Sequence, residues 1–205
     1  MIYIVGIGPG DKKYLTLNAI EIVENSDIVV GSSRALKLFD IEENKKYILT
    51  KNLVRELKNI VRSNKDKNIA ILSTGDPCFS GLLKTVLKYN IAKKEDISVI
   101  SGISSVQIAA SRLKISWEDY HILTLHGKEE NRKILLNLIK NNEKVIFLPN
   151  NLKEDVKYLI DNGISPNKKI IVCENLTYKN ERIIYDELKN IINIDFSYLC
   201  VCVVK

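Results

Sequence analysis

The sequence predicts an α/β protein made of two small domains, and three observations lead to this fold class. Over residues 1–114, short apolar runs alternate with amphipathic segments, which is typical of buried parallel strands separated by helices. Residues 115–118 interrupt this alternation. Beyond them, the last apolar runs follow one another too closely for helical crossovers, so the second sheet is expected to be mixed. We therefore expect one domain over residues 1–114 and another over residues 118–205.

The first domain is expected to consist of strands and helices in strict alternation. In its first helix, Leu15, Ala19 and Val23 share one face and Thr16 is a candidate N-cap. Parallel strands joined by helices give a doubly wound sheet. The expected strands are 2–7, 28–30, 47–49, 69–73 and 97–100, and the expected helices are 15–25, 33–39, 51–64, 80–90 and 103–113.

The second domain is expected to end in closely spaced strands that carry two of the four cysteines. Cys200 and Cys202 alternate along an apolar run, so both point to one face, and we expect buried, reduced thiols. With no C-x-x-C pair and only two histidines, no metal site is expected. The expected strands are 121–125, 145–148, 169–173, 182–185 and 198–204, and the expected helices are 129–141, 151–162 and 186–192.

The net charge of +6 is unevenly distributed along the chain. Residues 1–115 hold 18 Lys and Arg against 12 Asp and Glu, whereas the remaining residues hold 13 of each. The excess indicates either solvated helix faces or attraction of an acidic ligand. No basic stripe with interleaved aromatic residues points to nucleic acid. No apolar run approaches the ~20 residues of a membrane span and no signal peptide is visible, so we expect a cytoplasmic protein.

The glycine-rich turn after the first strand is the main clue to function. Residues 6–11 read Gly-Ile-Gly-Pro-Gly-Asp, which resembles a dinucleotide-binding loop at first sight. The third glycine of that motif is replaced by Asp11, whose carboxylate would repel a pyrophosphate, and Pro9 removes a backbone donor. The turn is therefore suited to close backbone approach by a ligand without phosphate groups.

Two further turns follow strands of the same predicted sheet, at residues 73–81 and 101–105. Because the carboxyl ends of parallel strands lie along one edge, the three turns are expected to converge there on a binding site. The Asp76 carboxylate either receives hydrogen bonds from a ligand or organises its own turn. Ser104 and Ser105 open the next helix, and one of them is expected to be its N-cap. S-adenosylmethionine, a cationic nucleoside without phosphate, fits this set of groups.

At these residues the chain resembles the tetrapyrrole methylase family of S-adenosylmethionine-dependent methyltransferases, and the resemblance covers essentially all 205 residues. It rests on VGIGPG in the first turn, STGDPCFSG in the second, SGISS in the third and ENLTY near the C-terminus. Three further segments resemble the branch that methylates ring carbon 5 of a cobalt-precorrin in anaerobic cobalamin biosynthesis. They are GSSRAL at 31–36, ISWED at 115–119 and HGK at 126–128.

The resemblance implies a class III methyltransferase fold, with two α/β domains and the cofactor folded in a cleft between them. It also implies which positions contact S-adenosylmethionine, with the backbone supplying much of the binding. These positions are Ile7, Gly8, Pro9, Gly75, Asp76, Phe79, Ser104, Ser105, Pro149 and Leu176.

Because a cobalt-precorrin carries many carboxylates, we expect basic residues to hold it. The candidates are Arg34, Lys51, Arg112 and Lys128, and for each an ordinary surface charge is an equally good interpretation. His126 is the candidate catalytic base, because histidine titrates near neutral pH, although a structural role is also consistent with its position. His121 is expected to be a packing residue.

The remaining expectations follow from the resemblance alone. It implies a homodimer and a separate carbon-15 methylase and decarboxylase as a functional partner. Two alternatives stay open, a tetrapyrrole methylase acting at another ring carbon and a methylase of the same fold acting on RNA or protein. A nucleotide-binding oxidoreductase or regulatory module is disfavoured by Pro9 and Asp11.

Overall fold

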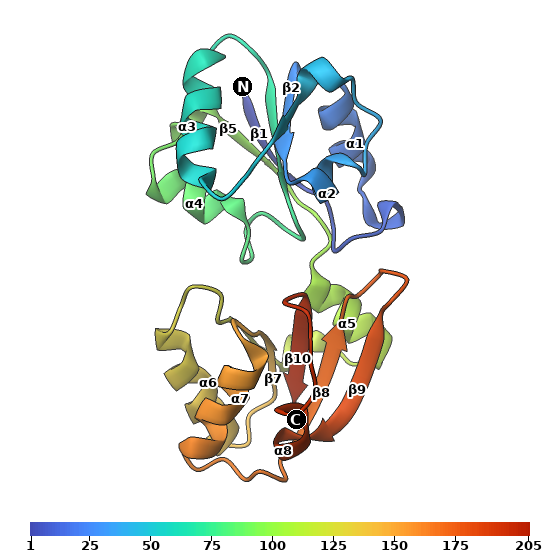
Figure 1. Ribbon diagram of the computed structural model, residues 1–205, viewed down its shortest axis with the longest axis vertical. Coiled ribbons are helices and arrows are strands. Elements are labelled where there is room, and N and C mark those ends of the chain that lie inside the picture. The colour runs from blue at the N-terminus through green and yellow to red at the C-terminus, as the bar shows by residue number, and fades with distance from the viewer. The chain divides into compact units, whose positions relative to one another are not determined.

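The computed structural model describes residues 1–205, which divide into two compact units, Met1–Ser104 and Ser105–Lys205 (Figure 1). The helix α5 (Ser105–Leu113) is grouped with the second unit, where it contacts strand β10 (Cys200–Val204). The boundary between the units therefore lies ten residues before residue 114, where we expected the first domain to end. Trp117–Asp119, which overlaps the expected linker at residues 115–118, forms a short 3-10 helix within the second unit.

The first unit is built on a five-stranded parallel sheet, which confirms the predicted architecture. Its spatial order is β3-β2-β4-β1-β5. The central strand pairs are in register, with Ile4 of β1 beside Ile71 of β4 and Val99 of β5. This order makes β4, β1 and β5 neighbours. The strands are β1 (Ile2–Gly6), β2 (Ile28–Gly31), β3 (Lys46–Ile48), β4 (Ile69–Ser73) and β5 (Ile97–Ile100).

Helices cover both faces of this sheet, as Figure 1 shows. Ala19 and Val23 pack with Val5 and Val29 on one face, whereas Leu57 packs on the other. The sheet thus has two apolar cores, one on each side, as a doubly wound fold requires. The helices on the first face are α1 (Leu17–Glu24) and α2 (Ser33–Leu36), and those on the second are α3 (Leu53–Ser63) and α4 (Leu82–Lys88).

The start of α1 shows how local chemistry sets a helix boundary. The Thr16 side chain accepts a hydrogen bond from the Ala19 N–H at 3.1 Å, which confirms the predicted N-cap. The helix begins at Leu17 rather than at residue 15 because a 3-10 turn over Lys12–Tyr14 comes first and leaves Leu15 extended.

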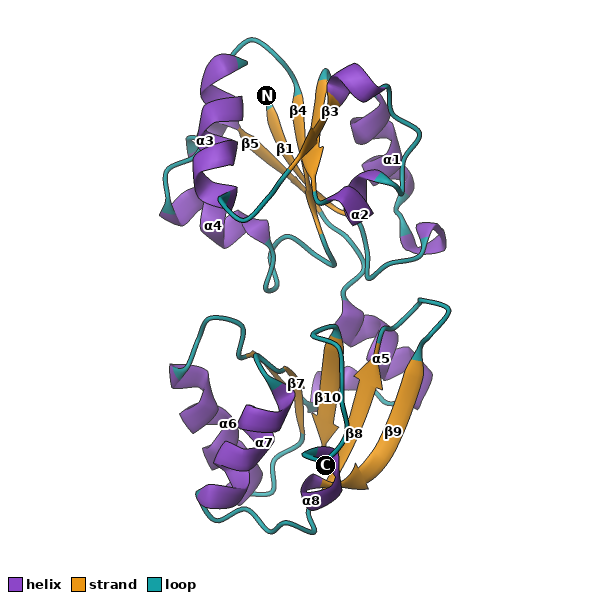
Figure 2. Cartoon of the chain, in the orientation of Figure 1, coloured by secondary structure: helices purple, strands orange, loops and turns teal.

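The second unit is built on a mixed five-stranded sheet of order β6-β7-β10-β8-β9. Figure 2 shows β7, β10, β8 and β9 of this sheet. Only β6 and β7 run parallel, whereas the other three pairs are antiparallel. The predicted antiparallel part is therefore confirmed. The remaining strands of this sheet are β6 (His121–Thr124), β7 (Val145–Leu148), β8 (Lys169–Glu174) and β9 (Arg182–Glu187).

The apolar core of the second unit lies between one face of this sheet and three helices. Cys200, Cys202 and Val204 of β10 belong to this core, so alternate residues of that strand share a face. The helices are α6 (Glu130–Lys140), α7 (Leu152–Asp161) and α8 (Leu188–Ile191). None of the helices in the chain is both long enough and apolar enough to span a bilayer.

The four cysteines are unpaired and differ in accessibility. Cys173, Cys200 and Cys202 are buried, as predicted for the last two, whereas Cys78 is exposed in a turn. Burial raises the pKa of the Cys173 and Cys200 thiols to about 12 and raises that of Cys202 well above its ordinary value. Partial burial and the nearby Asp76 carboxylate also raise the pKa of Cys78.

These differences predict selective labelling of the folded protein. At about pH 8, iodoacetamide is expected to modify Cys78 slowly and to leave the other three thiols intact, because thiolate and access are both required. Mass spectrometry of the native protein should show a single adduct, and Cys78→Ser should show none. Modification of a second thiol at a comparable rate in the folded protein would contradict the buried arrangement.

Candidate functional site

Three glycine-bearing turns lie side by side at one edge of the parallel sheet. They follow β4, β1 and β5, which are adjacent in the sheet and run in the same direction. The first two turns are joined directly: the Gly75 N–H donates to the Gly8 carbonyl at 2.9 Å, and the Gly8 N–H to the Gly75 carbonyl at 3.4 Å. The convergence predicted from the sequence is thus present within the first unit.

Gly6, Gly75 and Gly102 bring the three turns into backbone contact. A Cβ atom on Gly102 would lie 2.3 Å from the Gly75 carbonyl oxygen and 2.6 Å from the Gly6 carbonyl carbon. A Cβ atom on Gly6 would lie 2.5 Å from the Gly102 nitrogen. Such distances leave no room for a side chain, so these turns can meet only because Gly6 and Gly102 lack one.

The Asp76 carboxylate ties the second turn to the third. One oxygen accepts a hydrogen bond from the Cys78 N–H at 2.8 Å, and the other accepts one from the Gly102 N–H at 3.1 Å. The first bond organises its own turn, which is one of the two roles that the sequence left open. A carboxylate offers about four acceptor positions, so Asp76 retains capacity for a ligand.

At the sheet edge that these turns form, open space lies beside Gly75. This residue has a φ of +68°, which favours glycine, and no atom lies within 4 Å of the position that a Cβ would occupy. The turn that contains Gly75 also carries the Thr74 hydroxyl and the Asp76 carboxylate. A set of this kind can receive hydroxyl and amino groups.

The other predicted residues of these turns differ in exposure. Ile7 and Pro9 are buried, and the Ile7 N–H donates to the Ser73 carbonyl at 3.0 Å. Phe79 is half-buried in the second turn. Ser104 and Ser105 lie on either side of the division between the two units. Asp11 is an N-cap, because its carboxylate accepts from the Lys13 N–H at 2.9 Å.

Two of the predicted basic residues belong to the same unit. Arg34 follows β2, the neighbour of β4, and its guanidinium donates to the Thr74 hydroxyl at 3.0 Å. Arg34 therefore lies against the second turn. Lys51 follows β3, the outer strand at that end of the sheet, and lines a shallow hollow of about 560 Å³ along α3 together with Arg55, Lys58 and Arg62.

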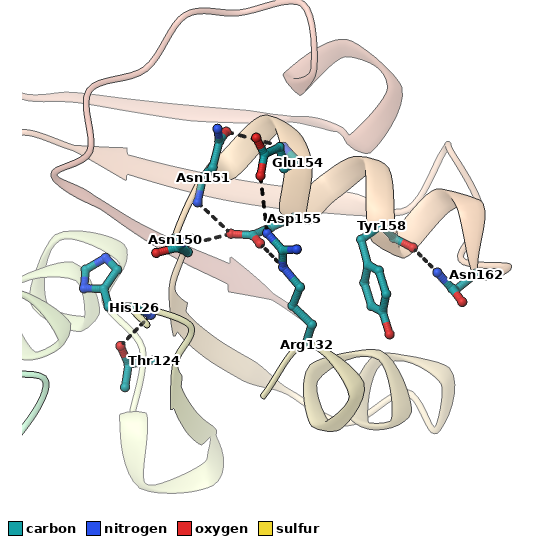
Figure 3. A network of polar contacts seen from close by, with 9 residues as sticks. All are labelled: Thr124, His126, Arg132, Asn150, Asn151, Glu154, Asp155, Tyr158 and Asn162. Atoms are coloured by element: carbon teal, nitrogen blue, oxygen red, sulfur yellow. Dashed lines mark hydrogen bonds and ion pairs between the residues drawn. The ribbon is translucent and has the colours of Figure 1, made fainter. Parts of the chain in front are cut away.

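In the second unit, the predicted residues His126, Lys128 and Pro149 gather at the carboxyl ends of the parallel pair β6 and β7. His126 is exposed, and its backbone N–H donates to the Thr124 hydroxyl at 3.3 Å (Figure 3). Pro149 is buried and lines a hollow of about 330 Å³ beside the start of α7. These residues thus lie on two neighbouring turns of one sheet edge.

The buried Asp155 fixes one of these turns, and the sequence analysis missed it. Its side chain is 1% exposed. One oxygen accepts from the N–H groups of Asn150 and Asn151 at 2.8 and 3.1 Å, and the other accepts from the Arg132 guanidinium at 2.7 Å (Figure 3). An acidic residue in the first turn of a helix is common on exposed faces as well, so its burial cannot be predicted from the sequence.

The last predicted residues lie near the turn between β8 and β9. Leu176 is buried in that turn. Arg112, expected to hold substrate carboxylates, is paired within the chain, because its guanidinium donates to the Glu181 carboxylate at 2.7 Å. The expectation that His121 is a packing residue is wrong, since its side chain is half exposed and lies 3.6 Å from the Glu143 carboxylate.

The close approach of the three turns predicts a steric cost for any side chain at Gly102. Gly102→Ala is expected to lower the free energy of unfolding by about 3 kcal/mol, because rigid backbone must move. The control is Gly163→Ala, where φ is +94° and the space is open, and about 1 kcal/mol should be lost. Urea unfolding checks both values. Equal losses for the two variants would contradict the close packing of the turns.

The sequence matches a known protein family and named relatives over most of its length. The family "Tetrapyrrole (Corrin/Porphyrin) Methylases" matches residues 1–192. A Methanocaldococcus jannaschii protein described as a probable cobalt-precorrin-7 C(5)-methyltransferase is 73% identical over 99% of this chain and 97% of its own length. The cobalt-precorrin-7 C(5)-methyltransferase of Salmonella typhimurium is 27% identical, over 89% of each chain.

Solved structures show the same fold. A precorrin-6Y methylase from Archaeoglobus fulgidus has a TM-score of 0.78 and 28% identity, covering 100% of this chain and 97% of its own. A Thermus thermophilus uroporphyrin-III C-methyltransferase, solved with S-adenosylhomocysteine, has a TM-score of 0.73 and 19% identity, covering 99% and 91%. By its sequence match and its fold, the chain belongs to the tetrapyrrole (corrin/porphyrin) methylase family.

Proposed function

We propose that this chain transfers a methyl group from S-adenosylmethionine to carbon 5 of cobalt-precorrin-7 in cobalamin biosynthesis. One observation carries the proposal: the 73% identity to the Methanocaldococcus jannaschii protein extends over 99% of the chain, and so includes all three glycine-bearing turns. The segments GSSRAL, ISWED and HGK resemble the same branch of the family.

The edge at the three turns suits this methyl donor. The turns offer the Asp76 carboxylate and backbone groups, and open space lies beside Gly75. Carboxylate and backbone groups can bind the hydroxyl and amino groups of a phosphate-free nucleoside. Bound S-adenosylmethionine supplies a methyl group on a sulfonium, and the C–S bonding pair stays on sulfur when the ring carbon takes the methyl. We propose Ile7, Gly8, Pro9, Gly75, Asp76, Phe79, Ser104, Ser105, Pro149 and Leu176 as its contacts.

The chain's main contribution to such a transfer is alignment. The leaving group is good and the ring carbon is electron-rich, so holding the two reactants in line is the chief requirement, and orientation can supply on the order of 7–11 kcal/mol. Turns fixed by backbone contact and by the Asp76 carboxylate are rigid enough to do this. The fixed turns therefore support a positioning role for this edge.

Basic residues are proposed to hold the carboxylates of the tetrapyrrole. Arg34 lies against the second turn, and Lys51 and Lys128 follow strands at the carboxyl edges of their sheets. Arg112 is a weaker candidate than the other three because Glu181 already faces its guanidinium. His126, exposed on the turn after β6, is our candidate for accepting a proton from the methylated carbon.

A cytoplasmic location and a homodimeric assembly are also part of this proposal. Three buried, unpaired thiols are usual in proteins that work in a reducing compartment, and they support the location. Sedimentation of the purified protein would report the assembly.

The function is tested with purified protein, cobalt-precorrin-7 and S-adenosylmethionine labelled in its methyl group. We expect one label per tetrapyrrole, located at carbon 5 by NMR and mass analysis.

An Arg34→Gln variant should raise the KM for the tetrapyrrole about tenfold, since one charged partner is lost.

Parallel reactions with uroporphyrinogen III and with RNA serve as controls, and neither should be labelled. Label at another ring carbon would show that the chain acts as a different tetrapyrrole methylase of the same family. Label on RNA in the absence of any tetrapyrrole would contradict the substrate class altogether.

A further inference from the structure

The turn between β8 and β9 contains an unusual backbone conformation. Thr177 has a φ of +74° and Asn175 has a φ of +50°, so both occupy the left-handed region. Asparagine adopts this region readily, but threonine is branched at Cβ and is a real outlier there. A conformation of this kind persists only where surrounding groups hold it, and it is frequent at functional sites.

The group that holds Thr177 is the carboxylate of Glu181, four residues further along. The Thr177 N–H donates to a Glu181 oxygen at 2.6 Å, a short and charge-assisted bond. Two backbone bonds complete the turn: the Tyr178 N–H donates to the Asn175 carbonyl, and the Glu181 N–H to the Tyr178 carbonyl, both at 3.0 Å. The strained residue is thus tied to Glu181, the residue that directly precedes β9.

Glu181 is itself held from outside the turn by Arg112 of α5. The Arg112 Nε atom donates to one carboxylate oxygen at 2.7 Å, and Nη2 lies 3.4 Å from the other. The two side chains are 35% and 21% exposed, so solvent only partly screens the pair. Burial raises the pKa of Glu181, but the bonds from Arg112 and Thr177 outweigh it and lower the pKa, so the carboxylate stays charged at neutral pH.

Leu176 lies between the two left-handed residues of this turn, and its side chain is buried, with 4% exposed. The start of the turn is anchored as well, because the Asn175 N–H donates to the Leu199 carbonyl at 2.9 Å and the Ser197 hydroxyl donates to the Asn175 side chain at 2.8 Å. The start of the turn is therefore held through Asn175, and Glu181 holds Thr177 on the other side of Leu176.

We infer that Glu181 is a positioning residue for cofactor binding: clamped by Arg112, its carboxylate keeps Thr177 left-handed and so holds Leu176 in the shape that receives S-adenosylmethionine. This inference rests on the proposed function, which makes Leu176 a cofactor contact. It also gives Arg112 a structural role in place of the substrate-binding role expected from the sequence.

Calorimetric titration with S-adenosylhomocysteine tests the inference without any tetrapyrrole. Glu181→Gln is expected to bind about tenfold more weakly than the wild type, because part of the binding free energy must then restore the turn. The matched control is Glu187→Gln, which removes a carboxylate at the end of β9 that pairs only with Lys169 and Lys189. This control should bind like the wild type.

A rescue variant separates positioning from a merely structural role. Glycine adopts positive φ without strain, so adding Thr177→Gly to Glu181→Gln should restore the affinity to within about threefold. The double variant keeps the test available even where Glu181→Gln alone unfolds, and Thr177→Gly alone should bind like the wild type. In the labelled-methyl assay, Glu181→Gln should raise the KM for S-adenosylmethionine and leave kcat within about twofold.

The outcomes are distinct. Unchanged affinity in Glu181→Gln, or equal loss in Glu181→Gln and Glu187→Gln, would overturn the inference and leave the proposed function standing. Failure of Thr177→Gly to rescue the folded double variant, or a large loss of affinity in Thr177→Gly alone, would also overturn it. If the wild type itself failed to bind S-adenosylhomocysteine, the proposed function would fall.

Discussion

The backbone contact between Gly6, Gly75 and Gly102 is the constraint on which the rest of the site depends. Three neighbouring strands of the first sheet end at one edge, and their turns can meet only if no side chain intervenes. Asp76 then joins the second turn to the third through the Gly102 N–H. Because the contact uses main-chain atoms, the resulting surface is rigid and offers backbone groups and one carboxylate. A surface of this kind suits a nucleoside without phosphate groups.

Carboxylates that accept backbone N–H groups recur at the turns of both units. Asp11 caps a 3-10 helix after β1, and Asp76 orders the turn after β4. Asp155 holds the turn after β7, and Glu181 holds Thr177 in the turn after β8. Each acidic side chain thus replaces water at amides that regular structure leaves unpaired. The fold positions these turns at strand ends, and the carboxylates give each turn a single shape.

The sequence predicted the elements well because hydrophobic period and turn chemistry agree along most of the chain. Every expected strand and helix exists, and Thr16 is the N-cap that its position predicted. What sequence reasoning could not supply were contacts between distant residues. The pairing of Arg112 with Glu181 spans 69 residues, and the burial of Asp155 depends on Arg132 of another helix. Local patterns carry no information on such pairs, so the sequence left Arg112 either as a substrate-binding residue or as an ordinary surface charge.

The central claim is that the three turns of the first unit form the edge that binds the cofactor. Nitrogen–proton correlation spectra of labelled protein, titrated with S-adenosylhomocysteine, test it residue by residue. We expect the amide signals of Gly8, Gly75, Asp76 and Gly102 to shift most among the residues of the first unit and to saturate together. Shifts confined to α3 and its basic hollow, with the signals of the three turns unchanged, would contradict it.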